Sequence, residues 1–406
     1  MKRATLGTLL LAVTLSASAH ENHAGHGAAK PDVGKMWQDM LKKPALSPSA
    51  AFDAEGRLWL AAAKDGFLLV SRSDDKGKTF GTPVAVNRVA ENIAADGENR
   101  PKIVLGNNGA VYVSYTSSLD KPFTGNVRFA RSLDGGRHFS DPITVNDNLD
   151  IVTHRFEALA VNGKGQVFLA WLDKRDQAAA AKKGEKYTGA ALYAAVSDDG
   201  GASFRPNFKL ADHSCECCRV AMGMDRDGIP VAFWRQVFGK NVRDHALVRL
   251  DGKSQPVRVS YDNWETDSCP HHGPSLSIAA DGVYHLAWFD NAPARRGLFY
   301  ARSTDQGKTF SAPLAFGNLD AQPAHPFVLA ADKGVAVAWK EFDGERSVVH
   351  AMRSADGGVT WSAPRKLAST AGGSDHPLLI ADKEQVYLLW NTLREGVQLI
   401  PAGAAD

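Results

Sequence analysis

The sequence predicts an all-β fold assembled from one repeated unit, and two recurring patterns lead to this prediction. The first pattern is Ser-x-Asp-x-Gly-x-x-aromatic, which occurs five times. Its serines are 59, 65, 106 and 51 residues apart, and a weaker copy at residues 250–253 divides the longest interval. A repeat of this length is typical of proteins that stack one supersecondary unit many times. The five serines are Ser73, Ser132, Ser197, Ser303 and Ser354.

The second pattern is a short apolar or alternating run that ends in an aromatic residue. Such runs predict half-buried strands, because successive side chains of a strand point to opposite faces of its sheet. Each run has a shorter strand before it and two more after it, so we expect units of four strands. Their first strands are expected near residues 48, 101, 156, 220, 274, 327 and 378. The aromatic residues are Tyr115, Trp171, Trp234, Trp288, Trp339 and Trp390, with a related run at residues 57–62 before them.

The Ser-x-Asp-x-Gly motif has the chemistry of a tight turn between the third and fourth strands. Glycine adopts a positive φ without steric cost, and the Asp and Ser side chains can bond nearby backbone N–H groups. The aromatic residue is expected to anchor the turn against the sheet.

These five copies resemble the Asp-box (BNR) repeats of sialidase-like β-propellers over nearly all of the chain after its N-terminal segment. The strand count predicts a seven-bladed β-propeller over residues 44–406. Six blades, the number in true sialidases, is the alternative. The last unit lacks an evident fourth strand after Ile400, so a segment before residue 48 is expected to close the ring.

The first 19 residues have the pattern of a signal peptide. A basic start is followed by the apolar stretch 6–15 and by the small residues Ala17, Ser18 and Ala19. We therefore expect cleavage after Ala19 and a periplasmic or secreted protein. No later stretch is apolar for the roughly 18 residues that span a bilayer. The net charge of +2 argues against a nucleic-acid partner.

Residues 20–43 form a histidine-containing tail ahead of the repeats. Cleavage after Ala19 makes His20 the first residue, whose amine and imidazole can chelate Cu(II) together. His23 and His26 extend this pattern, which is typical of metal-capturing segments. The alternative is a solvated linker that merely contains histidines.

All four cysteines and several histidines share one position in the repeat, the loop that leads into a first strand. The resemblance implies that these loops surround the central channel. Histidines scattered over a surface would not share a repeat position, so this group is the best candidate for a functional site. Its members are His154, His213, Cys215, Cys217, Cys218, Cys269, His271, His272, His325 and His376.

Two adjacent units carry the densest part of this group, residues 215–218 and 269–272. Thiolates and imidazoles together suit soft or borderline metals, and we expect copper, with zinc as the alternative. An exported chain also tends to oxidise its cysteines, and four cysteines allow three disulfide pairings. Structural disulfides, a metal site and redox chemistry therefore stay open.

A rival interpretation comes from Arg100, Arg155 and Arg219, which occupy the same position in three consecutive units. Sialidases hold a carboxylate with three arginines, so the resemblance implies an exo-sialidase that binds a small anionic ligand, with Glu157 pointing inward. No Tyr and Glu pair stands out for catalysis. A third possibility is a noncatalytic, protein-binding propeller with structural disulfides, and no particular protein partner is indicated.

One long connection, residues 172–190, contains a helix-favouring run at 177–183. It belongs to the face that holds the channel mouth. The segment is either a lid over the site or a surface excursion.

Overall fold

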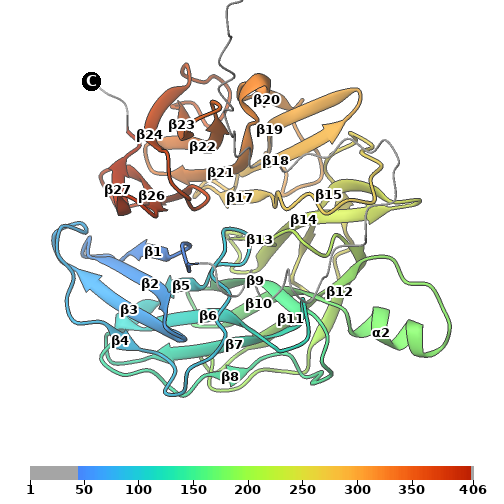
Figure 1. Cartoon of the computed structure of the whole chain (residues 1–406), viewed down its shortest axis with the longest axis horizontal. Helices are drawn as coiled ribbons and strands as arrows, with labels where there is room; N and C mark the ends of the chain where they lie inside the picture. Colours follow the sequence, from blue (N-terminus) through green and yellow to red (C-terminus); the bar gives the residue numbers. More distant parts are fainter. Residues whose placement is uncertain (1–43, 404–406) are drawn as a thin grey trace, which may run out of the picture.

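The computed structural model describes residues 44–403, and this part of the chain is built almost wholly from antiparallel strands (Figure 1). The first half contains β1 (Ser49–Phe52), β2 (Leu58–Lys64), β3 (Phe67–Ser73), β4 (Val84–Ala85), β5 (Lys102–Leu105), β6 (Val111–Ser118), β7 (Gly125–Ser132), β8 (Ile143–Thr144), β9 (His154–Val161), β10 (Val167–Asp173), β11 (Ala190–Ser197) and β12 (Phe208–Ser214). The second half contains β13 (Ala221–Met224), β14 (Pro230–Phe238), β15 (Val242–Arg249), β16 (Val257–Arg258), β17 (Ser275–Ile278), β18 (Tyr284–Ala292), β19 (Arg295–Ser303), β20 (Leu314–Phe316), β21 (Ala324–Ala331), β22 (Gly334–Phe342), β23 (Ser347–Ser354), β24 (Arg365–Thr370), β25 (Leu378–Ala381), β26 (Val386–Thr392) and β27 (Gly396–Pro401). The helical segments of the described part are η1 (Asn107–Gly109), α2 (Arg175–Lys182) and η2 (Leu319–Ala321).

The first strands of the predicted units form a closed ring. β1 contacts β5, and the contacts continue through β9, β13, β17, β21 and β25 back to β1 (Figure 1). Each sheet then extends outward by antiparallel pairing, which is the arrangement of a β-propeller. A pair between Ser214 and Gln236 joins two of the predicted units into one eight-stranded sheet. The count of seven blades therefore stays a prediction.

The aromatic residues that mark the second strands form the most deeply buried part of the core. Five tryptophans are at most 1% exposed, and each lies in the second strand of its unit. Burial of a large aromatic surface is among the strongest single contributions to a core. The strands predicted from these runs are thus confirmed. The tryptophans are Trp171, Trp234, Trp288, Trp339 and Trp390.

The five Ser-x-Asp-x-Gly turns share one geometry. In each turn the serine Oγ accepts a hydrogen bond of 2.7–2.9 Å from the glycine N–H four residues later, and that glycine has φ between 77° and 85°. The turns also contact the preceding sheet, since a Cβ on Gly201 would meet Phe129 and one on Gly358 would meet Tyr300. The repeat therefore fastens each turn to its neighbouring sheet as well as to its own strands.

The expected closure of the ring by a segment ahead of residue 48 concerns mostly residues 1–43, which lie outside the described residues, and it stays a prediction. The last sheet has three strands, β25 to β27, and within residues 44–403 no segment before β1 pairs with β27. The segment ahead of β1 instead contacts polar groups near the channel. Ser47 donates to Asp375 at 2.5 Å, and Arg100 donates to the carbonyl of Pro48 at 2.8 Å. Side-chain hydrogen bonds thus join the first and last sheets.

The long connection contains helix α2, as its composition predicts, and the helix protrudes from the outer edge of the molecule (Figure 1). None of its residues is buried, so the segment is a surface excursion. Among residues 44–403, no helix has the length and apolar character needed to cross a membrane. The predicted signal peptide and the histidines His20, His23 and His26 lie outside the described residues.

Candidate metal centre

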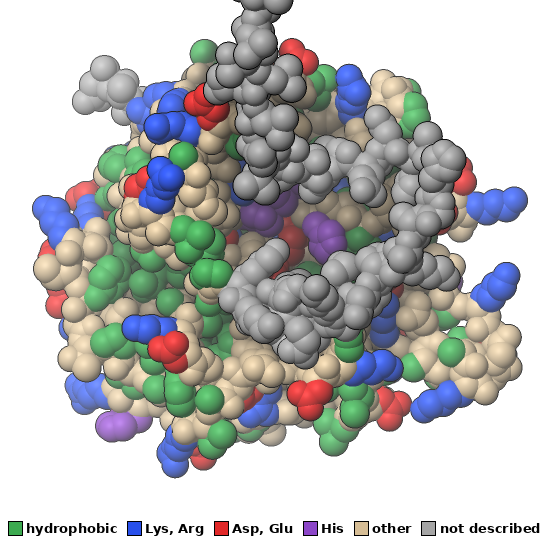
Figure 2. Space-filling model, viewed as in Figure 1, with side chains coloured by type: hydrophobic (Ala, Val, Ile, Leu, Met, Phe, Trp, Pro, Cys, Tyr) green, Lys and Arg blue, Asp and Glu red, His purple; other side chains and the backbone are tan. Residues whose placement is uncertain are grey.

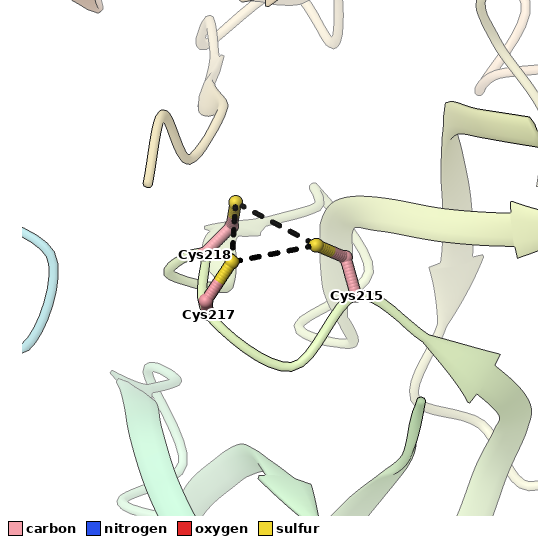
Figure 3. A group of neighbouring side chains, drawn as sticks. All are labelled: Cys215, Cys217 and Cys218. Atoms are coloured by element: carbon pink, nitrogen blue, oxygen red, sulfur yellow. Dashed lines mark hydrogen bonds between the residues drawn. The ribbon is translucent and has the colours of Figure 1, made fainter. Parts of the chain in front are cut away.

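Three cysteine thiols meet in the loop between β12 and β13. Cys215, Cys217 and Cys218 are each at most 5% exposed, and their side chains point toward one another (Figure 3). The Sγ atoms are 3.7 Å apart for Cys215 and Cys217, 3.9 Å for Cys215 and Cys218, and 4.0 Å for Cys217 and Cys218. The loop is held in place by the Cys215 N–H, which donates to the carbonyl of Arg235 at 2.9 Å.

This spacing is compatible with ligands of one metal ion and is too long for a disulfide bond. A disulfide needs sulfurs about 2.05 Å apart, and all four cysteines, which lie within the described residues, are free. A circle through the three Sγ atoms has a radius of about 2.2 Å, close to a metal–thiolate bond of about 2.3 Å. A single ion can therefore contact all three sulfurs without any movement of the loop.

Positive charge and thiol donors favour a thiolate at the centre of this group. Hydrogen bonds from Cys217 and Cys218 hold the pKa of Cys215 well below its usual value, and the charges of Arg235 and Arg243 act in the same direction. The Arg243 Nη1 donates to the Cys215 Sγ at 3.1 Å. The same hydrogen bonds raise the pKa of Cys217. Of the three buried cysteines, Cys215 is thus the one at which a thiolate is most strongly favoured.

Two further candidate ligands lie in the loop between β16 and β17. Cys269 and His271 are exposed, and their ligand atoms lie within 4.8 Å of each other and of the Cys217 Sγ. A hydrogen bond with Cys217 lowers the pKa of Cys269. We call these five residues the sulfur cluster: Cys215, Cys217, Cys218, Cys269 and His271.

A second polar group lies at the ring of first strands, and Figure 2 shows histidine and acidic side chains in the central hollow of this face. Glu98 accepts from Arg219 Nη1 at 2.7 Å and from the N–H of Gly273 at 2.8 Å. The Nδ1 atoms of His325 and His376 each lie 3.4 Å from the same Glu98 oxygen. Burial would raise the pKa of Glu98, but Arg219 and both histidines bring it well below its usual value. We call Glu98, Arg219, His272, His325 and His376 the channel cluster.

The single site expected from the sequence is therefore two clusters. His272 packs against Phe289 and His325, with ring centroids 4.2 and 4.5 Å away, and so belongs to the channel cluster. His154 and His213 join neither cluster. The Nδ1 of His154, in β9, pairs with the carbonyl of Gly125, in β7 of the preceding sheet, and that of His213 pairs with the carbonyl of Thr188.

Glu98, Arg235 and Arg243 were missed by the sequence reasoning. Glu98 lies two residues before Arg100, which the repeat places at the channel mouth, so an inspection of the whole loop would have found it. The two arginines lie in strands β14 and β15. Their sequence carries no signal that they face the cysteines.

The arginines proposed to bind a carboxylate are mostly engaged by the chain itself. Arg100 donates to Asp375 and to the carbonyls of Pro48 and His376. Arg219 donates to Glu98 and to two proline carbonyls. Arg155 is buried, lies over the ring of Phe156, and contributes to the wall of a cavity of about 750 Å³.

Glu157, the candidate inward-pointing acid, is buried and 1% exposed. It accepts a hydrogen bond from Thr116 at 2.8 Å, and burial raises its pKa. The residues that line the 750 Å³ cavity do not include Glu157.

The ring of first strands and the antiparallel sheets that extend from it define a β-propeller, and the predicted all-β propeller fold class is confirmed. The chain is similar to a PL25 ulvan lyase (TM-score 0.55, 10% identity, 89% of this chain and 91% of that chain). It is also similar to an α-L-arabinofuranosidase from Fusarium graminearum (TM-score 0.50, 12% identity, 76% and 92%) and to a Hadza microbial sialidase (TM-score 0.49, 16% identity, 86% and 74%). Comparison with family models and with curated proteins finds no match. At these identities the likeness concerns the fold alone, and membership of the BNR repeat family stays a prediction.

Proposed function

We propose that this protein binds Cu(I) through Cys215, Cys217 and Cys218. The observation that carries the proposal is the triangle of three buried thiols whose sulfurs are already spaced as ligands of one ion. Soft thiolate ligands select Cu(I), and three sulfurs around one ion suit its coordination.

The charge around the cluster matches Cu(I) bound by three thiolates, and the number of buried ligands, three rather than four, favours copper over zinc. Three thiolates and one Cu(I) carry a net charge of −2, and buried charge needs compensation. Arg235 and Arg243 are the two cations whose charges act on the cluster, and together they supply +2. Zn(II) is the competing ion, and its usual tetrahedral site needs a fourth ligand, for which Cys269 is the nearest sulfur.

The wider role that we propose is metal handling outside the cytoplasm. It rests on the predicted signal peptide and on the predicted chelating tail with His20, His23 and His26. In this scheme the tail captures copper and the sulfur cluster stores it.

Copper binding is tested by titrating the reduced protein, without oxygen, with Cu(I) in competition with a chromophoric Cu(I) chelator. The native chain is expected to take copper from the chelator, and the triple variant Cys215→Ser, Cys217→Ser, Cys218→Ser is expected to lose that ability. His138→Ala is the matched control, since His138 is an exposed histidine in a Ser-x-Asp-x-Gly turn. Equal copper uptake by the native chain and the triple variant would refute the proposal.

A sialidase-like glycosidase is the second candidate, and the 750 Å³ cavity lined by Arg155, Asp96 and His376 is the observation that favours it. The engaged state of Arg100 and Arg219 weighs against a free carboxylate-binding trio. Release of a fluorophore from a sialoside, abolished in Arg155→Ala, would support this candidate. A protein-binding propeller with structural disulfides has less support, because its cysteines would be paired.

A further inference from the structure

We infer that the sulfur cluster holds two Cu(I) ions, bridged by the thiolate of Cys217. This inference rests on the proposed copper binding and extends it. Its starting point is that the metal-ligating atoms form two groups of three, each within 4.8 Å, and that Cys217 is common to both. The inner group is Cys215, Cys217 and Cys218, and the outer group is Cys217, Cys269 and His271.

The geometry of the inner group leaves the outer ligands available for a second ion. An ion near the centre of the inner triangle has its three sulfurs at about 2.2 Å. This is close to the length of a metal–thiolate bond, about 2.3 Å. Cys269 and His271 are then unused. A thiolate keeps further lone pairs after binding one soft ion, so Cys217 can bind a second ion on its other side.

The charges are compatible with two ions as well as with one. Four thiolates and two Cu(I) ions carry −2, for which Arg235 and Arg243 supply +2. One Cu(I) with three thiolates and a protonated Cys269 carries the same charge, so the second ion adds no uncompensated charge. Glu216, in the same loop, adds no free charge because Lys174 pairs with it at 2.5 Å.

The two positions differ in their access to solvent. The inner sulfurs are buried, whereas Cys269 and His271 are exposed. An incoming or departing copper ion can therefore exchange ligands at the outer position without unfolding of the loop. The inner ion is expected to leave later, because it must first move to the outer position, which shares the Cys217 thiolate.

The test is the copper stoichiometry of the native chain and of the double variant Cys269→Ser, His271→Ala, each loaded with Cu(I) and dialysed without oxygen. We expect two ions per chain in the native protein and one in the variant. His138→Ala, loaded in the same way, is expected to keep two. X-ray absorption of the loaded native protein should show copper–copper scattering, a readout that does not depend on whether the variant folds.

One ion per chain in the native protein, without copper–copper scattering, would overturn the bridged pair and leave the proposed copper binding intact. No bound copper in the native protein would overturn the proposed function itself. Removal of copper by a chelator in two phases, of which the variant shows only the slower, would support the outer position as the site of exchange.

Discussion

The buried side chain of Asp290 should make the free energy of unfolding depend on pH, and the substitution Asp290→Asn should remove this dependence. Its side chain in β18 is fully buried, and its Oδ2 has no hydrogen-bond partner. Burial raises its pKa to about 7, although the Arg235 guanidinium, 4.0 Å away, acts in the opposite direction. The folded protein therefore prefers the protonated acid, while the unfolded chain ionises near pH 4.

The sign of the effect follows from this difference. The folded pKa lies above the unfolded one, so the contribution of Asp290 to stability is present below about pH 4 and is lost as the pH rises to about 7. A difference of about three pKa units corresponds to about 4 kcal/mol at most. Asp290→Asn should then stabilise the protein by up to this amount at pH 8 and have little effect at pH 4.

The assay is urea unfolding of the metal-free protein between pH 4 and pH 8, followed by tryptophan fluorescence. The quantity of interest is the difference in unfolding free energy between variant and native protein at each pH. Asp141→Asn, at an exposed ion pair with Arg88, is the control and should change stability by less than about 0.5 kcal/mol. A difference for Asp290→Asn that does not change with pH would refute the reasoning.

Two further predictions concern a turn and the metal cluster. Gly358→Ala should cost about 2–4 kcal/mol in urea unfolding, because φ is 85° and the new Cβ would clash with the Tyr300 hydroxyl. Gly357→Ala, where φ is 68° and the space is open, should cost only about 1 kcal/mol, and equal losses would contradict the role of this contact. Arg243→Met should weaken Cu(I) binding about tenfold in the chelator competition, because the Cys215 thiolate loses a charged donor. Unchanged affinity would show that Arg243 does not compensate the bound cluster.

The strands and turns could be predicted because they depend on local chemistry. Alternating apolar runs before residues such as Trp288 set the buried face of each second strand. A glycine such as Gly201, two residues after an aspartate, is required by the positive φ of the turn. The shared repeat position also predicted that Cys269 would lie near the other three cysteines, because equivalent loops of a ring converge on its centre.

The finer arrangement of the site could not be predicted, because it depends on contacts between distant segments. Glu98 is an ordinary loop acid in the sequence, and only the ring brings it against Arg219, 121 residues away. Neighbours in the chain also separate: His271 lies with the sulfurs, whereas His272 packs on Phe289. One residue of difference places them in different clusters, which no spacing pattern reveals.

The join between the first and last sheets has a mechanical consequence. No backbone ladder crosses it within residues 44–403. The two sheets are held together by side-chain hydrogen bonds such as those of Ser47 and Arg100, by the ion pair of Lys76 with Asp382, and by a hydrophobic cluster that contains Leu60 and Leu389. A pulling force applied to residues 44 and 403 should therefore separate the first and last sheets at this junction, here called the seam. The backbone hydrogen bonds within each sheet should break only later. A circular permutant that links these two positions and is cut in the exposed helix α2 would turn the seam into a covalent connection, and should resist that force better.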